Sequence, residues 1–365
     1  MSIDFGPERW EETKDNYRKW WAGELERPLL HFVMPGGNPD RPEPALPSKS
    51  FTVFYDLSVS ADEIVDRWDY DLCCQRFLGD SFPAVFPNFG PGVGAEFLGC
   101  GLEIDEPGET VWFHPKEDAS LDEMRIAYTE DSLWFKRIAD IKAAAGRRWQ
   151  GEVQIGMTDL GGAVDILSSF RPSEKLLLDL YDSPERVKEL TWQIHDAWLR
   201  YYEQFDRLLK PTNPGYSCWA TIFSCEPHYM LQCDFAYMIG PDMFEEFVLP
   251  ELAAVCKKLP NCMYHLDGPG QIPHLDSLLS IPELKGIQWV PGAGNPDCAH
   301  WPEVYGKIRK AGKLIQAFGG PEVLDALNEQ LGTLKGVQLW GWGGAENEAA
   351  TVECIKKYSG KTGGR

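Results

Sequence analysis

Four short apolar segments in the C-terminal half of the chain decide its fold. They are Cys262-Met-Tyr-His-Leu-Asp267, Gly286-Ile-Gln-Trp-Val290, Lys313-Leu-Ile-Gln-Ala-Phe318 and Val337-Gln-Leu-Trp-Gly341. A turn containing glycine or proline follows each segment, and a stretch of helical periodicity follows each turn. Short apolar runs bounded by turns are typical of buried parallel strands. Strands that alternate with helices pair through right-handed crossovers, so this half is predicted to be an α/β unit.

The same alternation extends toward the N-terminus. Residues 152–157 and 216–223 are predicted as strands, and 28–34 and 82–86 are candidate strands that complete a set of eight. Eight parallel strands, each followed by a helix, close into a (β/α)₈ TIM barrel. An open doubly wound sheet is the alternative, but no glycine-rich dinucleotide turn follows any of the strands. The predicted fold class is therefore an α/β, parallel eight-stranded barrel.

Two regions lie outside the regular alternation. Residues 9–22 have the periodicity of an amphipathic helix and form an N-terminal helical extension. An insertion is predicted near residues 90–150, where 110–114 reads as an edge strand. Residues 1–358 are taken as one barrel domain, and 359–365 as a flexible tail because they are rich in glycine and polar residues.

Composition narrows the possible partners. The chain carries 35 Lys and Arg against 56 Asp and Glu, a net charge of −21. Such a surface repels nucleic acid and anionic membranes. No apolar run approaches the ~18 residues of a membrane span, and no signal-like N-terminus is present. The ten cysteines include no CxxC pair, which favours reduced thiols and a cytoplasmic location.

The chemistry is expected at the carboxyl ends of the strands, where barrel enzymes place their active sites. His265 and Asp267 are two residues apart, so on a strand they point to the same side. They are predicted either as general acid and base or as ligands of one metal ion. The alternative is a structural His–Asp hydrogen bond. Asp159 and Tyr264 stand at strand ends too and complete the predicted catalytic set.

Softer metal ligands gather around the predicted strand 216–223. Cys218, Cys225 and Glu226 are candidate partners of His265 and Asp267 in a site for zinc or another divalent metal. The alternative is that the cysteines only fill the core. Tryptophans at strand ends suit stacking against a flat cofactor, although core packing would explain them as well; they are Trp219, Trp289, Trp340 and Trp342.

Several of these motifs resemble the uroporphyrinogen decarboxylase superfamily. The resemblance covers roughly residues 150–358 and implies a (β/α)₈ barrel. It implies one of two activities: cofactor-free decarboxylation of a tetrapyrrole, or zinc-dependent methyl transfer between a corrinoid and a thiol. In the second class zinc is held by a His-x-Cys pair and a later cysteine. The motifs are Met157-Thr-Asp-Leu-Gly-Gly-Ala-Val-Asp165, Asp182-Ser-Pro-Glu-Arg-Val187, Asp234 to Pro250, Tyr264-His-Leu-Asp-Gly268 and Lys313 to Val323.

The chain departs from both activity classes. Met34-Pro-Gly-Gly37 stands where the decarboxylases have an arginine-rich stretch, and Phe86-Pro-Asn-Phe89 lacks their aspartate. His265-Leu-Asp267 has a carboxylate in place of the methyltransferase thiolate, and Trp340-Gly-Trp-Gly-Gly344 lacks the final cysteine. The resemblance therefore implies a divergent member of the superfamily.

The favoured hypothesis is a metal-dependent methyltransferase. It would act on a small molecule and take the methyl group from a corrinoid held by a separate protein, and the superfamily also includes homodimers. The main alternative is a cofactor-free decarboxylase or other lyase, in which Asp159, His265 or Asp267 moves protons. A glycoside hydrolase, with carboxyl pairs drawn from strand ends, and a non-catalytic corrinoid-binding or porphyrin-binding barrel are the remaining hypotheses.

Overall fold

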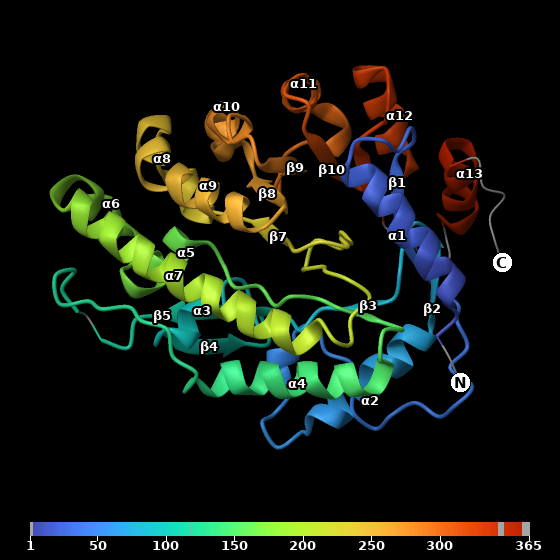
Figure 1. Ribbon diagram of the computed structural model, residues 1–365, viewed down its shortest axis with the longest axis horizontal. Coiled ribbons are helices and arrows are strands. Elements are labelled where there is room, and N and C mark those ends of the chain that lie inside the picture. Colours follow the sequence, from blue (N-terminus) through green and yellow to red (C-terminus); the bar gives the residue numbers. More distant parts are fainter. Residues whose placement is uncertain (1–2, 118, 342–346, 360–365) are drawn as a thin grey trace.

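A mainly parallel seven-stranded sheet organises the protein (Figure 1). The computed structural model describes residues 3–117, 119–341 and 347–359. The strand order is β2-β1-β11-β10-β9-β8-β7, and every neighbouring pair is parallel except β1 with β2. The strands are β1 (Leu29–Pro35), β2 (Gln75–Gly79), β7 (His228–Leu231), β8 (Asn261–Asp267), β9 (Leu284–Val290), β10 (Leu314–Gly319) and β11 (Val337–Gly341).

Two shorter ladders stand apart from this sheet. β3 (Ala84–Val85) pairs in parallel with β6 (Gln154–Ile155), and β4 (Gly101–Asp105) pairs antiparallel with β5 (Thr110–His114). Within the described residues no ladder joins β3 or β6 to the larger sheet, so no closed barrel is found. The prediction of an α/β fold with a parallel sheet is confirmed, whereas closure into eight hydrogen-bonded strands is not.

The predicted strand at 216–223 is wrong. These residues form a loop, called the interior loop (residues 217–223), whose base is closed by an antiparallel bridge between Tyr216 and Ser224. Thr221 has a φ of 51°, a left-handed conformation that interrupts any extended run. Ala220, Ile222 and Phe223 are apolar because the loop is buried in the interior. The strand that pairs with β8 begins only at His228.

Helices cover the outer side of the sheet, and Figure 1 shows α8 to α12 along β7 to β10. The α-helices are α1 (Pro7–Trp21), α2 (Ala61–Cys73), α3 (Gly94–Phe97), α4 (Leu133–Trp149), α5 (Ala163–Phe170), α6 (Ser173–Asp182), α7 (Pro184–Leu209), α8 (Pro241–Phe247), α9 (Leu249–Lys258), α10 (Leu275–Leu279), α11 (Pro302–Lys310), α12 (Pro321–Leu331) and α13 (Glu348–Ser359). The described residues also contain the 3₁₀ helices η1 (Thr52–Phe54), η2 (Asp234–Met238), η3 (Pro269–His274) and η4 (Cys298–His300).

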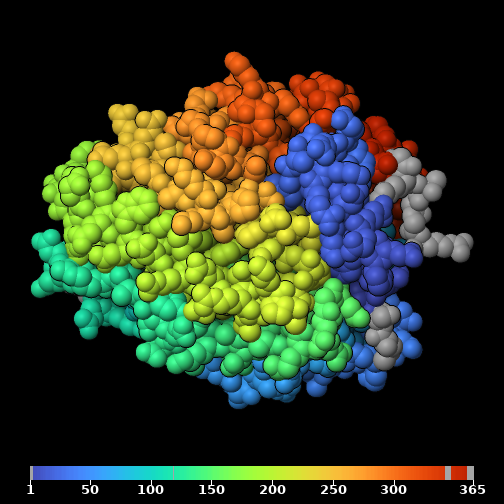
Figure 2. Space-filling view, viewed as in Figure 1, coloured from blue at the N-terminus to red at the C-terminus, as the bar shows by residue number. Residues whose placement is uncertain are grey.

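The predicted N-terminal helix is confirmed as α1. Its inner face buries Trp10, Tyr17 and Trp20. Trp21 Nε1 donates to the carbonyl of Phe223 at 2.9 Å, so α1 is attached to the interior loop. In the space-filling view, the blue N-terminal residues lie directly against yellow residues from the middle of the chain (Figure 2).

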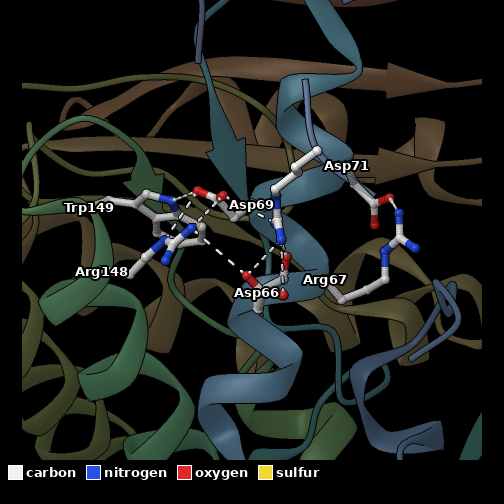
Figure 3. Close-up of polar contacts among 7 residues, drawn as sticks. Asp66, Arg67, Asp69, Asp71, Arg148 and Trp149 are labelled. Atoms are coloured by element: carbon white, nitrogen blue, oxygen red, sulfur yellow. Dashed lines mark hydrogen bonds and ion pairs between the residues drawn. The ribbon is translucent and has the colours of Figure 1, made fainter. Parts of the chain in front are cut away.

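The region near 90–150 contains the β4–β5 hairpin and α4. Helix α4 packs on α2 through a charged network that Figure 3 shows in close-up. Asp69 of α2 accepts hydrogen bonds from Arg148 at 2.7 Å and from the Trp149 indole at 2.9 Å. This network tethers the two helices on the side away from β7–β11. At the other end of the chain, Ser359, which was expected in the tail, ends α13, and residues 360–365 lie outside the described part.

None of the helices in the described residues combines the length and the apolar character needed to cross a membrane.

Candidate metal centre

One histidine and two aspartates converge at the carboxyl edge of the sheet. Asp234 lies on η2, just after β7, while His265 and Asp267 end the neighbouring strand β8. One possible ligand atom from each residue lies within 4.8 Å of the others. The convergence follows from topology, because β7 and β8 are parallel and their carboxyl ends meet at the same edge. The predicted pair His265–Asp267 therefore gains a third member.

Contacts on two sides orient the imidazole of His265. Its Nδ1 makes a hydrogen bond with Gln288 Oε1, and because that amide oxygen only accepts, Nδ1 carries the proton. The ring of Trp219 meets the imidazole edge-on, with centroids 4.9 Å apart at an interplanar angle of 89°. Nε2 faces Asp267, with 4.0 Å to its Oδ2. The free lone pair of Nε2 is thus presented to the carboxylates.

The segment that carries Asp234 is held in place by contacts with its surroundings. The backbone N–H of Phe235 donates to Asp165 Oδ1 at 2.8 Å, and His274 Nε2 donates to the carbonyl of Ala236 at 2.9 Å. Tyr237 lies against the backbone of the loop that follows β8. These contacts fix η2 against β8 and set the position of Asp234 relative to His265.

Acidic side chains crowd this edge, and loss of hydration is the main reason that the pKa values of Asp159, Asp165 and Asp234 are raised. Burial, followed by the nearby Asp234, raises the pKa of Asp165 to about 7. Burial is also the main reason that the pKa of Asp159 rises to about 6. Asp234 is exposed as a residue, but neighbouring atoms take part of the hydration from its carboxyl group, which raises its pKa; His265 opposes the rise and Asp267 adds to it. Carboxyl groups that repel one another in this way are stabilised by a positive charge placed among them.

The three side chains fit a divalent metal chemically. One imidazole and two carboxylates are ligands that zinc accepts, and the same set suits manganese or ferrous iron. Ligand atoms on one ion with bonds of about 2.1 Å lie about 3–4 Å apart. The observed spread of up to 4.8 Å therefore requires small side-chain rotations. Asp234 is exposed and Asp267 is partly exposed, so both carboxylates have room to move.

The structure does not bring the other predicted metal ligands to this group. Cys225 and Glu226 precede β7 and line a cavity of about 440 Å³ at the amino end of that strand. Cys218 lies in the interior loop, with its Sγ 3.6 Å from Nε2 of His228, the first residue of β7. Burial raises the pKa of the Cys218 thiol to about 12, so it is protonated near neutral pH. Cys225 and Glu226 therefore stand at the end of the sheet opposite to His265, and the Cys218 thiol is turned toward His228.

The predicted aromatic and catalytic residues divide between the two faces of the sheet. Trp219 contacts His265, and Trp340 lies beside Phe318 with ring centroids 5.2 Å apart. Tyr264 and Trp289 are the sequence neighbours of His265 and Gln288. Because successive residues of a strand point to opposite faces, both point to the other face of the sheet, where they are fully buried. Trp342 lies outside the described residues. Asp159 is buried behind the carboxyl edge, where Tyr229 OH donates to it at 3.3 Å.

Sequence reasoning missed three glutamines that belong to the site. Gln288, Gln316 and Gln338 lie on β9, β10 and β11 at mutually paired positions, in one row with His265. All three side chains are fully buried. A polar amide inside each of three consecutive apolar strands was the available signal, since buried polar groups require partners.

Comparisons with known proteins show a similarity in fold. No family model matches the chain, and no curated protein matches it. Among solved structures, the chain is similar to a methyltransferase from Methanosarcina mazei, with 14% sequence identity and a TM-score of 0.50. The similarity covers 75% of this chain and 80% of that one. At this identity the likeness concerns the fold.

Proposed function

We propose that this chain is a metal-dependent methyltransferase, a divergent relative of the uroporphyrinogen decarboxylase superfamily. Asp234, His265 and Asp267 would hold the metal, with zinc as the first candidate. The observation that carries the proposal is their convergence within 4.8 Å, with the Nε2 lone pair of His265 directed at the carboxylates. Similarity in fold to a methyltransferase and the sequence motifs around residues 234–268 support the same assignment.

The proposal includes a distorted (β/α)₈ barrel as the scaffold. β1, β3, β6 and β7 to β11 would be its eight strands, and the β3–β6 pair would sit in the gap between β1 and β7. The interior loop 217–223 reaches the middle of this arrangement, as its hydrogen bonds to β10 and β11 require. In such a barrel the substrate would approach from the carboxyl edge.

The residues around the metal centre would then have separate tasks. A divalent cation lowers the pKa of a thiol or water bound to it, which supplies a nucleophile near neutral pH. Trp219 shields His265 from solvent on one side. Trp340 and Phe318 form an aromatic wall that suits a planar corrinoid, presented as methyl donor by a partner protein.

Metal analysis tests this proposal first. Protein purified without a His-tag or chelator should hold about one divalent ion per chain, and His265→Ala or Asp267→Asn should remove it. His300→Ala is the matched control, because His300 pairs with Asp297 at 2.7 Å on the exposed surface. The loaded protein should also transfer methyl groups from a methylated corrinoid to a thiol. Full metal occupancy in His265→Ala would overturn the assignment.

A cofactor-free lyase is the second candidate, favoured by Asp159. Its pKa of about 6 suits a group that exchanges protons near neutral pH, and Tyr229 OH and the Gly161 N–H hold its carboxyl in place. Activity on a carboxylated substrate that survives chelators and His265→Ala but is lost in Asp159→Asn would favour this function.

A further inference from the structure

A continuous chain of side-chain amides runs from the candidate metal centre into the interior of the sheet. Gln288 Nε2 donates to Gln316 Oε1 at 2.5 Å, and Gln316 Nε2 donates to Gln338 Oε1 at 2.6 Å. At the outer end of this row of amides, Gln288 Oε1 accepts a hydrogen bond from Nδ1 of His265. The four residues occupy paired positions on four adjacent strands, so the backbone register brings their side chains together.

Two backbone carbonyls fix the direction of this chain. Gln316 Nε2 donates to the carbonyl of Ala220 at 2.7 Å, and Gln338 Nε2 donates to that of Thr221 at 3.3 Å. A carbonyl oxygen only accepts, so the amide nitrogens of both glutamines must face the interior loop. Reversing either amide would place two acceptors against each other inside the protein, which is costly.

The direction propagates outward by elimination. Gln316 Nε2 carries two protons, and both are used, by the carbonyl of Ala220 and by Gln338 Oε1. Its oxygen alone remains for the neighbouring strand, so Gln288 donates to it. With its Nε2 turned toward Gln316, Gln288 presents its oxygen to His265, and the imidazole carries its proton on Nδ1. The left-handed φ of 51° at Thr221 is part of the loop conformation that turns both carbonyls toward the strands. The interior loop thus determines the tautomer of a histidine several strands away.

We propose that Gln288, Gln316 and Gln338 are positioning residues that lock His265 as its Nδ1–H tautomer, with the interior loop at residues 220–221 as the reference point. The lock keeps Nε2 available as ligand or base and holds the ring plane. Hydrogen-bond partners that orient a ligating histidine typically change metal affinity by about 10–100-fold when removed. The inference rests on the proposed function only in taking Nε2 as the metal ligand, since the tautomer is a property of the metal-free protein.

The test reads the tautomer directly. In ¹⁵N-histidine-labelled, metal-free protein, two-bond ¹H–¹⁵N correlation spectra at one fixed pH should show His265 protonated on Nδ1, with the signal assigned through His265→Gln. Gln316→Met keeps the side-chain length but removes the amide, and should give a mixture of tautomers with zinc binding weakened about tenfold. Gln330→Met is the matched control, because Gln330 donates to the carbonyl of Ala299 and takes no part in the row of amides.

A second pair of variants keeps the test valid if Gln316→Met does not fold. Gln288→Glu, as the neutral acid that this buried position favours, can donate its proton to Gln316 Oε1 and still accept the Nδ1 proton, so it should preserve the tautomer, whereas Gln288→Met should lose it. An unchanged Nδ1–H tautomer in Gln316→Met and Gln288→Met, or an Nε2–H tautomer in the native protein, would overturn the proposal. If the native tautomer is Nδ1–H and follows the variants but no metal binds, the positioning role stands and the metal-dependent function fails.

Discussion

The ring of Tyr237 lies so close to Gly270 that a Cβ atom at that glycine would stand 2.4 Å from the Tyr237 Cε2 atom. Tyr237 belongs to η2, which carries Asp234, while Gly270 belongs to η3, the short helix that follows Asp267. The contact therefore joins the two segments that supply the three candidate ligands. The glycine is needed for its lack of a side chain, which allows the aromatic ring to rest on the loop.

Replacing Gly270 with alanine should separate the ligands. The added methyl group must displace Tyr237, and η2 should move with it and carry Asp234 away from His265. We expect metal affinity to fall about tenfold, as when ligand-orienting contacts are lost, with little change in thermal stability because Tyr237 is exposed. Competition with a chromophoric chelator measures the affinity. Gly240→Ala is the control, since a Cβ at Gly240 meets no atom within 4 Å; equal affinity in the two variants would argue against the coupling.

Asp159 should make the metal-free protein less stable as the pH rises. Its folded pKa is about 6, above the ordinary value of 3.8, so between these values the unfolded chain loses the proton while the folded chain keeps it. The unfolding free energy should fall by up to about 3 kcal/mol across this range. Asp159→Asn should remove this contribution and so change the slope of unfolding free energy against pH, which denaturant titrations at pH 4, 5 and 6.5 in the presence of a chelator would show. The same slope of unfolding free energy against pH in the unmodified protein and in Asp159→Asn would contradict the raised pKa of Asp159.

His31 should have the opposite effect, destabilising the protein in acid. Burial lowers the pKa of this imidazole from 6.5 to about 4. Between these values the unfolded chain binds a proton that the folded chain rejects, so stability falls as the pH drops, by up to about 3 kcal/mol. His31→Leu should remove this contribution, so that between pH 4 and 6.5 the unfolding free energy of the variant rises less, or falls more, with pH than that of the unmodified protein. His300→Gln, at an exposed position, should keep the slope of the unmodified protein.

The buried ion pair between Arg27 and Asp80 should be the most sensitive charged contact near β1. Arg27 makes two hydrogen bonds to the carboxylate, at 2.7 and 2.8 Å, and the backbone N–H of Leu30 adds a third at 3.0 Å. Asp80→Ala leaves the guanidinium without its partner, and we expect a loss of about 3–5 kcal/mol in chemical denaturation. Asp276→Ala removes the exposed pair with Lys307 and should cost less than about 1 kcal/mol. Comparable losses in the two variants would show that burial of the Arg27 pair is unimportant.

Most of the sheet was predictable from local pattern. β8 to β11 read as short apolar runs between turns, and their observed bounds match the predicted ones to within about two residues. The segment 216–223 was misread because a buried loop and a buried strand are equally apolar. The left-handed φ of Thr221 and the hydrogen bonds to Gln316 and Gln338 distinguish the two, and neither is visible in the sequence pattern.

The candidate site was predictable in part. His265 and Asp267 followed from their spacing on one strand, because alternation is a local rule. Asp234 joins them through the packing of η2 on the loop after β8, and no spacing in the sequence encodes that contact. The cysteines misled for a related reason: Cys225 and Glu226 are near a strand in sequence, but they stand at its amino end.

The interior loop has a consequence for the order of assembly. The carbonyls of Ala220 and Thr221 find their partners 96 and 117 positions later in the chain. During synthesis these carbonyl groups cannot form their hydrogen bonds until β10 and β11 have been made, and the apolar side chains beside them stay unpacked until then. Contacts of such high order slow folding, because the chain must be closed over a long distance before they form. The loop and the last two strands are therefore expected to become ordered together, in the final cooperative step of folding.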